Sequence, residues 1–190
     1  MERRRAKKID GFTLLELLVL LTIGAMLLSM GVPAFQSIVA DQRSTTTANE
    51  LIESLILARS EAIKRGRYVS VCKSPNGVFC VADADWNDGW IIFTNVSATS
   101  PDTVDAGDEI LRIHQSLPDI LEIESIGNIN SFISFRPAGT SGTKVVNFSG
   151  TLTLCDQNSY TGPRGLVVFP SGRIQVTRDD DHAGVPLECA

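Results

Sequence analysis

The chain has 190 residues, of which 43% are hydrophobic and 21% are charged, and its formal net charge is −5. This composition is typical of a folded domain and excludes an intrinsically disordered chain. The charge is uneven, because basic residues dominate positions 1–11 and acidic residues dominate beyond position 40. An acidic domain has no general attraction for nucleic acid or an anionic membrane surface, so such contacts would require a local basic patch.

An apolar run follows the basic residues and reads FTLLELLVLLTIGAMLLSMGVPAF from Phe12 to Phe35. A helix of this length crosses a bilayer at a rise of about 1.5 Å per residue. The preceding positive charges predict a cytoplasmic N-terminus and an exported C-terminal part. No A-x-A-like site follows the run, which argues against an ordinary secretory signal and leaves an uncut signal anchor as the alternative.

Glu16 is the only charged residue in the apolar run. A carboxylate near a bilayer centre costs about 2.5–3.5 kcal/mol on insertion scales, so a partner is expected. The sequence switches abruptly from polar to apolar between Gly11 and Phe12. Cleavage there would create a new α-amino group on Phe12, and the ammonium of a neighbouring subunit would be a suitable partner for Glu16.

The segment Gly11-Phe12-Thr13-Leu14-Leu15-Glu16, followed by the apolar run, resembles the class III signal of type IV prepilins and pseudopilins. The resemblance implies that residues 1–11 are a leader removed by prepilin peptidase, that Phe12 is N-methylated, and that Glu16 acts in subunit docking. It also implies a single-pass protein of the bacterial inner membrane with a periplasmic C-terminal domain. Such a protein joins a pilus or pseudopilus through contacts between its N-terminal helix and other pilins.

Residues 36–66 continue the helix as an amphipathic half, after residues 12–35 as the membrane and assembly half. Leu51, Leu55, Ala58 and Ala62 recur at helical spacing and predict one buried stripe. Pro33 loosens or kinks the helix within its apolar half. Gly66 is a suitable residue for the helix end.

The period changes to that of strands after Gly66, and turn residues separate the segments. Strands are expected at 68–72, 78–81, 90–94, 110–114, 121–126, 132–135, 145–148, 151–155, 166–169 and 174–177. No second helical pattern is present. The sequence therefore predicts an α+β fold, in which an antiparallel sheet domain at 67–190 packs on the amphipathic half of the helix.

Four cysteines, Cys72, Cys80, Cys155 and Cys189, all lie beyond the apolar run. An even number on one side of a membrane segment suits an oxidising compartment and two disulfides. Chain proximity favours Cys72–Cys80, which leaves Cys155–Cys189. Free buried thiols are the alternative, whereas the absence of a C-x-x-C spacing disfavours zinc.

Three internal segments, Ala58–Ile63, Trp86–Phe93 and Asp108–Arg112, resemble the GspH/FimT group of minor pilins and pseudopilins. The resemblance implies the type IV pilin fold and a structural role in priming or capping filament assembly. The cysteines and the Gly-Arg segment at 172–173 favour a pilus subunit over a type II secretion pseudopilin, which remains the alternative.

Metal and catalytic sites have little support in the sequence. The stretch from Asp83 to Gly89 fails as an EF-hand loop, because its glycine is one position late and its twelfth position is Thr94. The acidic loop at 102–109 is a looser alternative for calcium. The two histidines, His114 and His182, accompany no nucleophile motif, so we expect neither an enzyme nor a cofactor.

A DNA-binding receptor pilin for natural transformation is the alternative from a different functional class. Gly172 and Arg173 begin a segment similar to the Gly-Arg-x-Arg pattern that FimT-like pilins use for DNA, although Gln175 replaces the second arginine and three aspartates follow Arg178. Contacts would therefore come from Arg173 and Arg178. A basic neighbour brought close by the fold, such as Lys144 or Arg164, would add to them.

Overall fold

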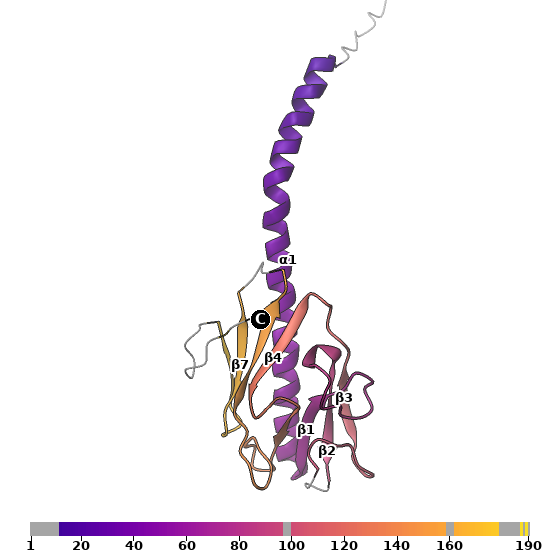
Figure 1. Ribbon diagram of the computed structural model, residues 1–190, viewed down its shortest axis with the longest axis vertical. Helices are drawn as coiled ribbons and strands as arrows, with labels where there is room; N and C mark the ends of the chain where they lie inside the picture. The colour runs from indigo at the N-terminus through magenta and orange to yellow at the C-terminus, as the bar shows by residue number, and fades with distance from the viewer. Residues whose placement is uncertain (1–11, 97–99, 159–161, 179–186, 188, 190) are drawn as a thin grey trace, which may run out of the picture. The chain divides into compact units, whose positions relative to one another are not determined.

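The computed structural model describes residues 12–96, 100–158 and 162–178 together with Leu187 and Cys189, except for the side chains of residues 30–34. The chain divides into two compact units, Met1–Val39 and Ala40–Ala190. The long helix α1 (Leu14–Arg65) begins in the first unit and ends in the second (Figure 1). A single 3-10 turn, η1, and the strands make up the rest of the regular structure in the described residues.

The strands of the second unit form two four-stranded antiparallel sheets, ordered β3-β2-β1-β5 and β4-β6-β7-β8. Figure 1 shows these sheets side by side, with residues 40–65 of α1 behind them. The bounds are β1 (Tyr68–Lys73), η1 (Trp86–Asp88), β2 (Trp90–Asn95), β3 (Ile110–His114), β4 (Leu121–Gly127), β5 (Phe132–Phe135), β6 (Gly150–Asp156), β7 (Arg164–Val168) and β8 (Ile174–Thr177).

The main core lies between α1 and the inner faces of both sheets. Leu51, Leu55, Ala58 and Ala62 are all buried there, as their helical spacing predicted. The sheets contribute alternating residues of their strands, since successive side chains of a strand point to opposite faces. The set is Val69, Val71, Trp90, Ile92, Leu121, Ile123, Ile133, Phe135, Leu152, Leu154, Leu166 and Val168. The predicted α+β fold is confirmed.

The first sheet is also covered on its outer face. Cys72, Ile91 and Phe93 form a second buried cluster there, with Cys80 and Val104 packed against it from two loops. Burial on both faces explains why every residue of β2 is buried. It also explains why the sequence of β2 is a continuous run rather than an alternating one.

The helix ends at Gly66, as expected. Gly66 has a positive φ of 62°, a conformation that favours glycine. Its N–H donates to the carbonyl oxygen of Ile63, and the N–H of Arg67 donates to that of Ala62. This pair of hydrogen bonds is the Schellman arrangement, which satisfies carbonyls at the helix end and turns the chain into β1.

Two predicted strands, 78–81 and 145–148, are wrong. Residues 74–81 form a loop that the Cys72–Cys80 disulfide closes, in which the N–H groups of Val78 and Phe79 donate to the side chain of Asn76. Residues 143–146 form a tight turn, in which the N–H of Thr143 donates to the carbonyl of Val146 at 2.8 Å. The segment from 145 to 148 keeps one isolated bridge, Gly142 with Asn147. In both places the strand-like pattern comes from exposed apolar residues of a loop or turn, Val78 and Phe79 in the first and Val145 and Val146 in the second.

Candidate functional site

The predicted docking residue Glu16 lies in the first turn of α1. Its Oε2 accepts hydrogen bonds from the backbone N–H and the hydroxyl of Thr13, each at 3.1 Å. The N–H of Glu16 in turn donates to the Thr13 hydroxyl at 3.2 Å. The two residues therefore form a capping box. The T-x-x-E spacing of the sequence could have predicted it. Phe12 is exposed, and Gly11 lies outside the described residues.

Large apolar side chains of α1 are exposed to solvent from the start of the helix to Leu28. They are Leu14, Leu15, Leu17, Leu18, Val19, Leu20, Leu21, Ile23, Met26, Leu27 and Leu28. An apolar surface of this extent requires a cover of apolar groups. Among the described residues, no helix has both the length and the apolar character that a membrane crossing needs.

Two disulfides join Cys72 to Cys80 and Cys155 to Cys189, the pairs that chain proximity favoured. The first closes the loop between β1 and η1. The second links β6 to the C-terminal tail, where Leu187 packs on Gly165 of β7. A Cβ atom on Gly165 would lie 2.6 Å from a Leu187 methyl group, so a larger residue here would displace the Leu187 side chain.

The two candidate DNA-contacting arginines lie at opposite ends of β8. Both are exposed, and Arg173 stacks over the Phe169 ring at 4.4 Å. At about 3.3 Å per residue, roughly 16 Å of strand separates the two positions. Neither forms an ion pair with another described residue.

The two basic residues that could add to the DNA contacts of Arg173 and Arg178 differ in whether they can reach a phosphate. Lys144 is exposed on the 143–146 turn. Arg164 lines a small pocket with Arg178, but its side chain is only 6% exposed and is bound by Asp41 at 2.5 Å and Ser44 at 3.0 Å. Arg164 is therefore a poor phosphate contact, since its charge is already neutralised inside the domain.

A groove of about 530 Å³ lies between the α1 residues 42–50 and the segment from Arg112 to Leu121. His114 forms part of its wall and stacks on Trp90 at 3.8 Å, nearly parallel to it. Its Nε2 lies 3.0 Å from the carboxylate of Glu50, and the Trp90 Nε1 donates to the hydroxyl of Ser54. These contacts tie the first sheet to α1. The lining contains no serine–histidine or cysteine–histidine pair of the catalytic kind. His182 lies outside the described residues.

The acidic segments considered for calcium are engaged in backbone hydrogen bonds. The carboxylate of Asp108 accepts from the N–H groups of Val96 and Asp105, and that of Asp88 accepts from the N–H of Asp85. Glu109 pairs with Arg65 at 2.6 Å. Within the described residues, no three carboxylate, histidine or cysteine side chains converge as they would around a metal ion.

The chain matches the family described as "Type II transport protein GspH" over residues 47–179. The chain belongs to this family. The matched range runs from the buried face of α1 to the end of β8. GspH proteins are minor pilins and pseudopilins, structural subunits of the type IV pilin-like class.

Two solved structures of one minor pilin support the same fold. Two crystal structures of the type IV minor pilin FimU of Pseudomonas aeruginosa are similar to the chain. One is 25% identical with a TM-score of 0.51 and covers 70% of this chain and 91% of its own. The other is 24% identical with a TM-score of 0.54, and covers 72% of this chain and 90% of its own. The minor pseudopilin EpsH of Vibrio cholerae has a TM-score of 0.49 at 11% identity, over 72% of this chain and 97% of its own. No curated protein is significantly similar to the chain in sequence.

Proposed function

We propose that this GspH-family chain is a minor subunit of a type IV pilus that primes or caps filament assembly. The observation that carries the proposal is the first part of α1, which exposes apolar side chains on all sides and contains one carboxylate. Lipid covers this surface before assembly, with residues 12–35 in the inner membrane, and the equivalent helices of other pilins cover it in the filament. The exported domain at 67–190 carries the two disulfides.

The first step of this life cycle is processing by prepilin peptidase. Cleavage after Gly11 and methylation of the new α-amino group of Phe12 leave the apolar helix intact on the mature chain. Intact-mass measurement of the membrane-extracted protein should show loss of residues 1–11 and the gain of one methyl group. A mature chain that still begins at Met1 would contradict the proposal.

Glu16 would then dock against the amino group of Phe12 on a neighbouring subunit. Because Glu16 also caps its own helix, a test must separate the two roles. We expect Glu16→Ala to be inserted and cleaved but to be nearly absent from sheared filaments. Thr13→Ala is the matched control, since it weakens the cap by about 1 kcal/mol and leaves the carboxylate in place. Equal incorporation of Glu16→Ala and wild type would exclude the docking role.

The pilus branch is favoured over type II secretion by the likeness to FimU at 25% identity and by the two disulfides. Deletion of the gene in its native host should abolish surface pili and leave exoprotein secretion unchanged. Loss of secretion with normal piliation would assign the chain to a secretion pseudopilus instead.

DNA binding is a second candidate function, favoured by the exposure of Arg173 and Arg178. Two such phosphate contacts in an acidic chain predict weak, sequence-independent binding, in the micromolar range or poorer. A titration of the chain with duplex DNA at two salt concentrations tests it. Arg173→Gln should lower the affinity and reduce the salt slope by about one unit, whereas Gln175→Ala, on the same strand, should change neither. The absence of binding at low salt would remove this candidate.

A further inference from the structure

The loop closed by Cys72 and Cys80 presents two large apolar side chains to solvent. Val78 is 60% exposed and Phe79 is 53% exposed. The loop rests on β3, because a Cβ atom on Gly77 would lie only 2.9 Å from a methyl group of Ile113, which is itself 48% exposed. Single exposed apolar residues need no explanation, but a cluster of large ones marks an interaction surface. We call Val78, Phe79 and Ile113 the outer apolar surface.

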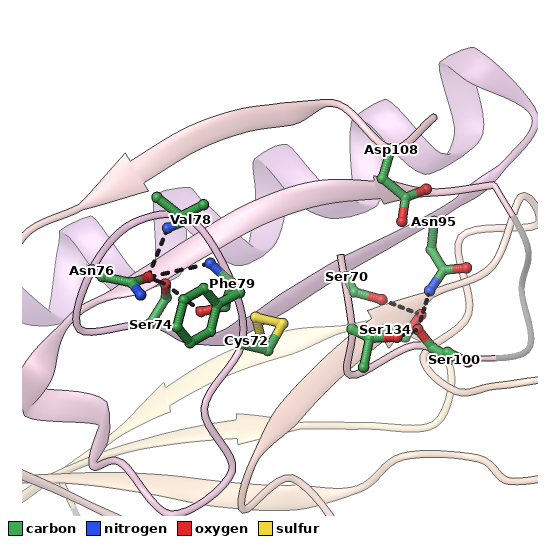
Figure 2. The surroundings of a disulfide bond; sticks show 12 residues. Ser70, Cys72, Ser74, Asn76, Val78, Phe79, Asn95, Ser100, Asp108 and Ser134 are labelled. Atoms are coloured by element: carbon green, nitrogen blue, oxygen red, sulfur yellow. Dashed lines mark hydrogen bonds between the residues drawn. A yellow bond between two sulfur atoms is a disulfide. The ribbon is translucent and has the colours of Figure 1, made fainter. Parts of the chain in front are cut away.

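The loop holds these side chains in a fixed position. Figure 2 shows the Asn76 side chain turned back onto the loop, where its Oδ1 accepts from the N–H groups of Val78 at 2.9 Å and Phe79 at 3.2 Å. The hydroxyl of Ser74 donates to the carbonyl of Phe79 at 2.7 Å. Together with the disulfide, these bonds order the loop in the free protein. A partner that binds it therefore pays little conformational entropy.

The surroundings of the outer apolar surface are acidic. Asp83 and Asp85 are exposed directly after the disulfide loop, and Asp102 is exposed on the loop at 100–109. That second loop covers the same outer face of the first sheet, since Val104 packs there against the Cys72 cluster. None of the three carboxylates forms an ion pair with another described residue. A binding partner must therefore complement an apolar centre with a negative rim.

We propose that the outer apolar surface is the docking site for another subunit of the same filament, one that presents apolar side chains flanked by lysine or arginine. The assignment rests on the proposed function as a filament subunit. Charge decides the class of partner, because opposite charges at a rim guide association and like charges oppose it. A second copy bound through the same surface would place Asp83 and Asp85 against themselves. Nucleic acid and anionic lipid would meet the same repulsion.

Photocrosslinking of the full-length chain in its own cells tests the contact. A photoreactive phenylalanine analogue, p-benzoylphenylalanine, replaces Phe79, and in a matched control it replaces Val145, which is 90% exposed on a different loop. We expect an adduct from position 79 with a protein that mass spectrometry identifies as another subunit with a class III signal. An adduct with a second copy of this chain or with a protein outside the filament would overturn the assignment. So would equal yields from both positions, or none from position 79.

Incorporation into sheared filaments separates this inference from the proposed function. Phe79→Ser should lower the amount of the chain in filaments by about tenfold, the size of effect expected for a central apolar contact. The double charge reversal Asp83→Lys with Asp85→Lys should also lower it, and Val145→Ser should leave it unchanged. Wild-type levels of Phe79→Ser in filaments would overturn the docking site alone. Absence of the wild-type chain from filaments would overturn the proposed function and the docking site with it.

Discussion

Three arginines act inside the domain, two by joining segments distant in sequence and Arg136 by holding the nearby 143–147 turn. Arg59 of α1 donates to the carbonyl of Gly139 at 2.8 Å and to that of Ser171 at 3.4 Å. Arg136 donates to the carbonyl of Thr143 and to the side chain of Asn147. Arg164 joins β7 to α1. Each satisfies backbone or side-chain acceptors that would otherwise be costly to bury, so these charges serve stability.

Gly172 lies where two of these segments meet. Its φ is 76°, and a Cβ atom there would collide with the carbonyl oxygen of Gly139, the same oxygen that Arg59 binds. We therefore expect Gly172→Ala to lower the free energy of unfolding by at least about 2 kcal/mol, from backbone strain and steric overlap together. Urea unfolding followed by circular dichroism measures the change.

Gly162 is the matched control for this prediction. A Cβ atom there would have no neighbour within 4 Å. We expect Gly162→Ala to change the free energy of unfolding by less than about 0.5 kcal/mol. An equal loss in both variants would show that the close approach at Gly172 is not the cause.

At the scale of elements, the two disulfides close loops of different length. Cys155 and Cys189 are separated by 34 residues, and Cys72 and Cys80 by 8. Chain-entropy reasoning assigns about 4 kcal/mol to the longer loop and about 2.5 kcal/mol to the shorter one. The longer bond also holds the tail over β7, where Leu187 packs on Gly165.

We therefore predict that removing the Cys155–Cys189 bond destabilises the domain more than removing the Cys72–Cys80 bond. Two double Cys→Ser variants, one for each disulfide, test this. The variant without Cys155–Cys189 should have a lower thermal unfolding midpoint than the variant without Cys72–Cys80. The comparison is internal, since each variant pair controls for the other. A lower midpoint for the Cys72–Cys80 variant would contradict the prediction.

The last turn of α1 contains a small ionic network with a defined pH dependence. The Arg65 guanidinium donates to Glu61 at 2.5 Å and lowers the pKa of that carboxyl below its ordinary value of 4.5. A carboxyl with a lowered pKa in the folded state stabilises the fold above its unfolded pKa. The contribution is lost as the pH falls through the folded pKa.

Glu61→Gln should therefore flatten the loss of thermal stability between about pH 5 and pH 3 relative to wild type. The effect should be small, because the partners Lys64 and Arg65 keep 76% and 34% of their side chains in contact with solvent, and it should shrink in 1 M salt. Unfolding temperatures of the two proteins, measured by scanning fluorimetry at low salt and in 1 M salt, provide the test. Identical slopes for the two proteins at low salt would contradict it.

At the scale of the whole molecule, the second unit contains its own core. Every member of the main buried cluster lies between Ala48 and Val168. All four disulfide-bonded cysteines also belong to the second unit, since the first of them, Cys72, lies on β1. Among the described residues, no member of that cluster comes from the first unit. Burial of apolar surface is the dominant stabilising term, so the second unit has what it needs to fold by itself.

We predict that a fragment of residues 40–190 unfolds cooperatively in aqueous buffer. Its thermal unfolding midpoint should lie within a few degrees of the midpoint that the second unit shows when the full chain is unfolded in mild detergent. Circular dichroism in the near and far ultraviolet checks both the midpoint and the fixed packing of Trp86 and Trp90. A fragment without near-ultraviolet signal would show that the first unit is required for packing.

The sequence alone determined the features that depend on local periodicity. The buried stripe Leu51, Leu55, Ala58 and Ala62, the helix end at Gly66 and most strands follow from patterns of 3.6 or 2 residues, because such patterns record which face of an element is buried. The disulfide pairing followed from chain proximity. The capping box of Thr13 and Glu16 was also readable from its spacing.

Only the tertiary structure decided which side chains meet across long separations. One example is the division of the strands into two sheets. Others are the burial of Arg164 against Asp41 and the packing of the Gly77 loop on Ile113, which bring together residues from different elements. Local periodicity contains no information on such pairs. The same reason explains the wrong strand at 78–81, since Val78 and Phe79 are apolar residues of an ordered loop, exposed on its surface.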